Sequence, residues 1–149
     1  MNKDLIFKAI DLAKKAQETE DVPVGAIVVK DGEIIGEGYN KREADGDPTA
    51  HAEVVAIRCA AERLGSWRLD DCDLYVTLEP CPMCAGAIIN SRIKTLVFGA
   101  YDKKAGSTSN ESVTNLFNLP YNHVPTVYGG ICENECAELL TEFFKKRRV

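Results

Sequence analysis

Residues 73–84 of the chain read DLYVTLEPCPMC, and they join a strand pattern directly to a helix start. The first half is rich in aliphatic, aromatic and β-branched side chains, which favours a strand over residues 73–78. Proline is well tolerated at the first helical position, because its missing N–H has no partner there, so Pro82 indicates that a helix begins at this point. Cys81 and Cys84 are three residues apart and share one face of that helix start, where both can bind one metal ion.

A second fragment with metal-binding side chains, His51-Ala52-Glu53, lies thirty residues before the first of these cysteines. It follows the run DPT at 47–49, which is typical of a capped helix N-terminus. The apolar residues after it have helical spacing and predict the buried face of this helix, which consists of Val54, Ile57, Ala61 and Leu64. Two helix starts are thus expected to meet at one metal ion.

The chemistry of these side chains indicates a catalytic zinc site. Structural zinc sites use four protein ligands, whereas catalytic sites have three and keep one position open for water. Residues two apart do not share a helix face, so Glu53 is not expected to bind the ion alongside His51. We predict that His51, Cys81 and Cys84 bind zinc, and that Glu53 exchanges a proton with the water that the ion activates.

The residues leave two alternatives open. Cys81 and Cys84 could form a four-thiolate structural site with Cys132 and Cys136, which lie on an amphipathic helix pattern near the C-terminus. Glu53 could be a solvated acid that merely suits the positive end of the helix dipole.

The composition is that of a globular protein with reduced thiols. The chain has 149 residues, 45% of them hydrophobic and 28% charged, which fits one domain over residues 1–149. No apolar run reaches the ~20 residues that cross a membrane, and the first residues do not resemble a signal peptide. Six cysteines without a secretory signal favour metal over disulfides, so we expect a cytoplasmic protein. Cys59 is expected in the core and His123 in a loop or a packing position.

Helix and strand patterns alternate along the chain, which predicts a layered α/β domain. The apolar helical period is clearest at residues 5–16 and at 136–144. The expected strands cover residues 24–29, 33–39, 73–78, 95–99 and 126–128. The Asp31-Gly32 pair predicts a tight hairpin turn, and the polar residues 101–112 predict a loop.

These motifs resemble those of the bacterial tRNA-specific adenosine deaminases, in the cytidine deaminase-like superfamily, and the similarity covers nearly the full length. It is carried by VPVGA at 22–26, DPTAHAE at 47–53, EPCPMCAGAI at 79–88, VFGA at 97–100, NH at 122–123 and FF at 143–144. The H-x-E and P-C-x-x-C motifs alone are shared with cytosine, cytidine and guanine deaminases, so they indicate the reaction and not the substrate.

The resemblance implies a three-layer α/β/α cytidine deaminase-like domain with a five-stranded mixed sheet, one zinc ion per chain and a homodimer. It also implies hydrolytic conversion of adenosine to inosine at the wobble position of a tRNA anticodon. Carried over by position, Asn40 would hydrogen-bond the purine, the Ala52 amide would hold the reacting group, and Asp102 would meet the nucleotides beside the flipped base. From the residues alone, Asn40 could equally be a turn residue and Asp102 a solvated acid. The alternative function is a small-molecule deaminase acting on guanine or cytosine compounds.

The evidence for RNA binding is divided. A net charge of −5, from 18 basic and 23 acidic residues, is unfavourable for a general phosphate binder. Phe143, Phe144, Lys145 and Arg147 nevertheless join aromatic to basic side chains, as single-strand binders do, although basic residues also suit a helix C-terminus. Residues 107–115, STSNESVTN, depart from the Gly-Ser-Leu-Met-like run expected by resemblance. We expect this segment to affect RNA recognition and to leave the zinc chemistry unchanged.

Overall fold

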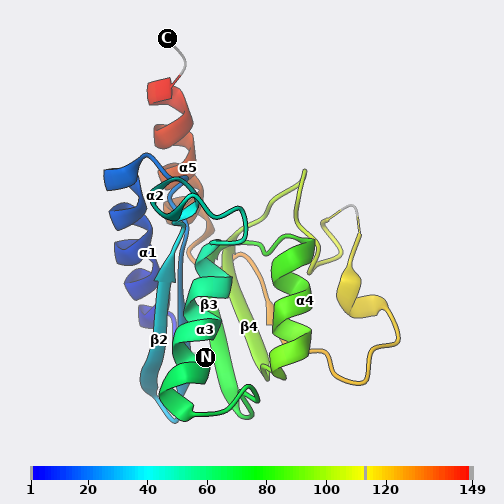
Figure 1. Ribbon diagram of the computed structural model, residues 1–149. Coiled ribbons are helices and arrows are strands. Elements are labelled where there is room, and N and C mark those ends of the chain that lie inside the picture. Colours follow the sequence, from blue (N-terminus) through cyan, green and yellow to red (C-terminus); the bar gives the residue numbers. More distant parts are fainter. Residues whose placement is uncertain (1, 113, 148–149) are drawn as a thin grey trace.

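The chain forms a five-stranded sheet between two layers of helices (Figure 1). The computed structural model describes residues 2–112 and 114–147; Met1, Val113, Arg148 and Val149 lie outside the described residues. In chain order, the elements are α1 (Asp4–Ala16), η1 (Gln17–Thr19), β1 (Gly25–Lys30), β2 (Glu33–Tyr39), α2 (Arg42–Asp45), α3 (Ala52–Leu64), β3 (Cys72–Leu78), α4 (Pro82–Ser91), β4 (Thr95–Ala100), η2 (Leu116–Asn118), β5 (Thr126–Tyr128) and α5 (Glu133–Arg147).

The sheet is mixed, which confirms the expected architecture. Its strand order is β2-β1-β3-β4-β5; β1 is antiparallel to both neighbours, and β3, β4 and β5 are parallel. The β1–β2 hairpin turns through Asp31 and Gly32, whose φ angles of 51° and 77° match the turn that the Asp-Gly pair predicts. Since β3 and β4 are parallel, their carboxyl ends lie at the same edge of the sheet, where α4 begins.

The two faces of the sheet bury two separate cores. Side chains of successive strand residues point to opposite faces, so Leu74 and Val76 pack on the α3 and α4 side, and Tyr75 packs on the side of α1 and α5. β3 is therefore covered on both faces, which explains its nearly continuous apolar sequence. The three layers are α3 and α4, then the sheet, then α1 and α5.

The buried face of α3 differs from the prediction. Ala52, Ala56 and Ala60 are buried against the sheet, whereas the predicted face of Val54, Ile57, Ala61 and Leu64 is only partly buried or exposed. The reason is a close approach of two backbones. A Cβ added at Gly38 of β2 would lie 2.5 Å from the carbonyl oxygen of Ala52. Only small residues fit at this contact, so alanines form the buried face of α3. Ile57 packs against the core but is only partly buried, and Cys59, expected in the core, is exposed.

Replacing Gly38 by alanine is expected to destabilise the protein by about 2 kcal/mol, because the added methyl group overpacks the contact between β2 and α3. Glu37 lies between the two glycines of β2 and is exposed. Glu37→Ala is the matched control, and its effect should stay within about 0.5 kcal/mol. Urea unfolding of the two variants measures the difference. Equal unfolding midpoints would show that α3 can move away from the strand at no cost.

Several smaller features complete the fold. Sequence patterns did not indicate η1, α2 or η2. The His123 side chain lies in a loop with Nε2 2.7 Å from the carbonyl oxygen of Ile93, which confirms a loop and packing position. Over residues 2–112 and 114–147, the helices are too short or too polar to cross a membrane.

Candidate active site

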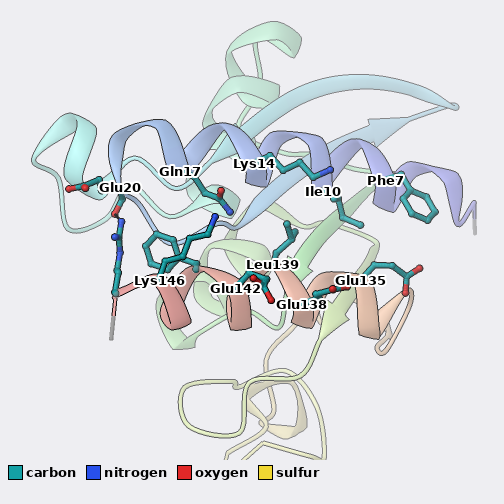
Figure 2. A pocket seen from close by; sticks show the side chains of 12 residues that line it. Phe7, Ile10, Lys14, Gln17, Glu20, Glu135, Glu138, Leu139, Glu142 and Lys146 are labelled. Atoms are coloured by element: carbon teal, nitrogen blue, oxygen red, sulfur yellow. Dashed lines mark hydrogen bonds between the residues drawn. The ribbon is translucent and has the colours of Figure 1, made fainter. Parts of the chain in front are cut away.

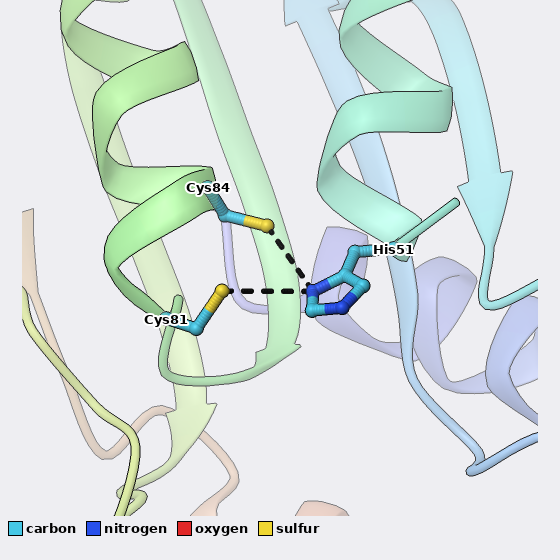
Figure 3. A group of neighbouring side chains, drawn as sticks. All are labelled: His51, Cys81 and Cys84. Carbon is cyan, nitrogen blue, oxygen red and sulfur yellow. Dashed lines mark hydrogen bonds between the residues drawn. The ribbon is translucent and has the colours of Figure 1, made fainter. Parts of the chain in front are cut away.

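The site lies where α3 and α4 begin, at the edge of the sheet where β3 ends (Figure 3). His51 is the residue before α3 and Cys81 the residue before α4, and both have extended backbone conformations. Pro82 occupies the start of α4, as its sequence position predicted, and Cys84 lies in the first turn. Two helix N-termini thus bring a histidine and two cysteines together from segments thirty residues apart.

The spacing of the three side chains suits a zinc ion. His51 Nδ1 lies 3.6 Å from the Sγ atom of Cys81 and 3.5 Å from that of Cys84. A tetrahedral zinc ion with ordinary bond lengths separates a nitrogen ligand from a sulfur ligand by about 3.6 Å. His51 Nδ1 therefore already stands at the separation from both sulfur atoms that such an ion requires, and all three ligand atoms lie within 4.8 Å of one another.

The four-thiolate alternative is contradicted. Within the described part of the chain, the group of side chains able to hold a metal consists of His51, Cys81 and Cys84. Cys136 is buried on the opposite side of the sheet, where α5 packs against Gly99 of β4. A site with three protein ligands fits a catalytic metal better than a structural one.

Hydrogen bonding distributes the protons unequally between the two thiols. The side-chain hydrogen bond from Cys84 lowers the pKa of Cys81 to about 4, despite its partial burial, and His51 contributes in the same direction. The same bond raises the pKa of Cys84, and burial raises it further. The pKa of His51 is raised by its hydrogen bond to Cys81, against the effect of burial. Because metals bind thiolate and neutral imidazole, loading of the site should release protons.

Glu53 is buried beside these ligands. Its side chain is 4% exposed, so the alternative of a solvated helix-start acid is wrong. Burial is the main cause that raises the pKa of Glu53 to about 7; the Cys81 charge acts in the same direction, and a bond from its own backbone N–H acts against both. A nearby divalent cation would lower this pKa again by favouring the charged form. A carboxyl group poised near neutral pH can both accept and return a proton.

Asn40 and Ala52, both expected at the substrate, are bonded to each other. The Ala52 backbone N–H donates to Asn40 Oδ1 at 2.8 Å, and Asn40 Nδ2 donates to the Val22 carbonyl oxygen at 3.0 Å. Asn40 thus fixes the first amide of α3, next to His51. The capping expected from residues 47–49 is wrong, because Thr49 donates to the Asp47 carboxylate from both its backbone and its hydroxyl.

Asp102, the third expected substrate residue, lies in the loop after β4. Its carboxylate accepts hydrogen bonds from the backbone N–H groups of Lys104 and Ala105 at 3.1 Å and 3.0 Å. The loop also contacts Glu79, a buried residue that the sequence patterns did not single out. An acidic residue directly after a buried strand was the available signal for it.

The aromatic and basic residues of α5 line two grooves, and Arg147 lines both of them. Phe143 is 7% exposed, and the Arg147 guanidinium carbon Cζ lies over its ring, 4.0 Å from the ring centre. Arg147 also donates to the Glu20 carbonyl oxygen at 3.4 Å, beside the groove between α1 and α5 that Figure 2 shows. Phe144 is 46% exposed and lines a second groove, of about 760 Å³, with Lys145 and Lys104. The second groove borders the loop that contains Asp102, because Lys104 belongs to that loop.

Comparisons with known proteins show the family of the chain. The family described as MafB19-like deaminase matches residues 1–148. The chain is 45% identical to the tRNA-specific adenosine deaminase of Bacillus subtilis (strain 168), over 99% of its own length and 92% of that protein. Among solved structures, one from work on A-to-I editing by tRNA:A34 deaminases at the wobble position has a TM-score of 0.89 and 45% identity, over 93% of this chain and 100% of the other.

A guanine deaminase from Bacillus subtilis is also similar. Its structure has a TM-score of 0.65 and 48% identity, over 68% of this chain and 66% of that one. The match to the tRNA deaminases extends over more of the chain and has the higher TM-score. The chain belongs to the MafB19-like deaminases and, within them, to the family of tRNA-specific adenosine deaminases.

Proposed function

We propose that the protein hydrolytically deaminates adenosine at the wobble position of a tRNA anticodon, giving inosine and ammonia. The observation that carries the proposal is the set of three ligand atoms at zinc spacing, with the buried Glu53 carboxyl beside them. The full-length similarity to tRNA-specific adenosine deaminases supports the choice of substrate.

His51, Cys81 and Cys84 are the proposed ligands of one zinc ion per chain, which would supply the activation of water. In the reaction, water oxygen bonds to C6 of the adenine ring and the C6–N bond breaks. Glu53 accepts one proton from the water and gives it to N1 of the ring. It then takes the second proton from the new C6 hydroxyl and gives it to the departing amino group, so inosine keeps the N1–H and the leaving group is ammonia. Asn40, through its bond to the Ala52 amide, keeps the start of α3 in place while these transfers occur.

The second groove, lined by Lys104, Phe144 and Lys145, is the proposed contact with the anticodon stem-loop. An exposed aromatic ring that lines one groove with two cations suits an unstacked nucleotide and its phosphates. Phe143 is buried and its ring packs edge-on against that of Phe144, so it supports Phe144 and does not itself stack on a base. Arg148, the last basic residue, lies outside the described residues.

Substituting Lys104 and Lys145 together by alanine is expected to weaken stem-loop binding by about tenfold and to reduce the slope of log affinity against log salt by about 1 to 2. The reason is the loss of two phosphate contacts. Lys14→Ala with Lys15→Ala, on the last turn of α1, is the control and should leave the slope unchanged. Fluorescence anisotropy over a range of salt concentrations measures both. An unaltered slope in the Lys104 and Lys145 variant would place the RNA elsewhere.

The proposal also covers the domain organisation, the location and the oligomeric state. We propose one domain over residues 1–149, a cytoplasmic location and a homodimer. On α3, Val54 and Leu64 offer partly exposed apolar side chains for a second copy to cover. Sedimentation equilibrium would contradict the dimer if the protein remained a monomer at micromolar concentration.

A small-molecule deaminase is the second candidate, and the similarity to the guanine deaminase structure favours it. Incubating the zinc-loaded protein with the stem-loop, free adenosine, cytidine and guanine in parallel separates the two candidates. Inosine in the stem-loop without turnover of the free compounds is the expected result. Turnover of a free base with an unaltered stem-loop would overturn the tRNA substrate.

A further inference from the structure

One buried acidic side chain next to the ligands takes no part in the proposed chemistry. Glu79 follows the last residue of β3 and precedes Cys81 by two residues. Only 2% of it is exposed. A buried carboxylate needs hydrogen-bond donors, since an unsatisfied one is strongly unfavourable.

All the hydrogen-bond donors to the Glu79 carboxylate come from the loop after β4. Glu79 Oε1 accepts from the Asp102 N–H at 3.1 Å. Oε2 accepts from the Thr108 N–H at 3.1 Å and from the hydroxyls of Ser109 at 2.9 Å and Thr108 at 3.4 Å. One carboxylate therefore holds both ends of the segment 102–109.

The packing around this carboxylate is tight. A Cβ added at Gly106 would lie 2.4 Å from Glu79 Oε1 and 2.4 Å from the Asp102 carbonyl oxygen, so the loop turns directly over the carboxylate. The neighbouring residue continues the contact, because the N–H and the hydroxyl of Ser107 both lie 3.1 Å from the Pro80 carbonyl oxygen. The segment 102–109 is thus fastened to the two residues that lead into Cys81.

We propose that Glu79 is a positioning residue for the substrate. It holds the segment 102–109, with Asp102 and Lys104, at a fixed place relative to the ligand Cys81, so that the nucleotides flanking the target adenosine meet a preformed surface. The inference rests on the proposed tRNA substrate. It also gives a role to the Ser-Thr-Ser sequence at 107–109, where the chain departs from the expected family run: these side chains bond to Glu79 and Pro80.

The test uses the zinc-loaded Glu79→Gln variant, with Ser109→Ala as a milder second variant that keeps the carboxylate. Ser66→Ala, which removes an exposed hydroxyl in the loop between α3 and β3, is the control. Three quantities are measured: amide hydrogen exchange over residues 102–109, zinc content, and KM and kcat on the anticodon stem-loop.

In Glu79→Gln, exchange over residues 102–109 and the KM for the stem-loop should each rise about tenfold, because one buried bond is lost and the segment opens more often. The value of kcat should change by less than about threefold, since the reacting atoms keep their partners. Ser109→Ala should shift exchange and KM in the same direction by about threefold. Zinc content should stay equal to that of the wild-type protein.

Other outcomes overturn the inference in distinguishable ways. Faster exchange with an unchanged KM would make Glu79 a purely structural residue, and unchanged exchange would show that it does not hold the segment. If Glu79→Gln loses zinc, hydrogen exchange over residues 102–109 and the KM for the stem-loop are compared in Ser109→Ala instead. Unchanged values in that variant overturn the positioning role. A wild-type protein that forms no inosine in the stem-loop would overturn the proposed function, and the positioning role would be overturned with it.

Discussion

Replacing Glu53 by glutamine should lower the rate of inosine formation by about a thousandfold or more, which is within the range that general acid–base catalysis contributes. Glutamine keeps the size and hydrogen-bonding shape of the side chain but cannot accept and return a proton. Its site is buried at the start of α3, so bulk buffer has little access to replace it. Single-turnover deamination of the stem-loop measures the effect.

The zinc content of Glu53→Gln should remain at the wild-type value, because the three proposed ligand atoms come from other residues. Glu62→Gln is the matched control: it makes the same chemical change on the same helix, at an exposed position. Its rate should equal that of the wild-type protein. A Glu53→Gln variant that had lost its metal would assign the carboxylate to the ligand set, and one that was fully active would remove it from catalysis.

Replacing Cys84 by alanine should remove both the metal and the activity. Cys84 is fully buried in the first turn of α4. Its loss leaves His51 and Cys81, too few ligands for tight zinc binding. The melting temperature should also fall by several degrees, because a metal that binds only the folded state stabilises that state. Metal analysis and calorimetry measure the two effects.

Cys136→Ala is the control for this variant. Cys136 is equally buried, but it lies on α5 on the other side of the sheet, packed against Gly99 of β4. The variant should lose stability through the small cavity and retain its full zinc content. Loss of zinc from Cys136→Ala would reinstate the four-thiolate site that the arrangement of the side chains contradicts.

Local patterns predicted the elements that depend on local chemistry. The strands at 33–39 and 126–128 have the expected bounds, and Pro82 marks the start of α4 as expected. The meeting of His51 with the cysteine pair also followed from two helix starts and the ligand preferences of zinc. In these cases the side chains that set the structure are neighbours in sequence.

Features that depend on distant partners were missed. The short helix α2 is held by Asp21, whose carboxylate accepts from the Glu43 N–H at 2.8 Å. The start of α3 is bonded to Asn40 and not to the adjacent residues 47–49. Glu79 is buried by a loop more than twenty residues later in the chain. The spacing of residues along the sequence does not indicate such distant pairs. The buried face of α3 was misassigned for the same reason, because it is set by the contact with Gly38 of β2.

The most direct test of the central claim is deamination of the wobble adenosine in water labelled with heavy oxygen. The zinc-loaded protein is incubated with the anticodon stem-loop, and the released nucleosides are analysed by mass spectrometry, with Glu53→Gln in parallel. The expected result is inosine that carries the heavy oxygen, formed by the wild-type protein and almost absent with Glu53→Gln. An unmodified stem-loop, or inosine without the label, would contradict hydrolytic deamination of tRNA at this site.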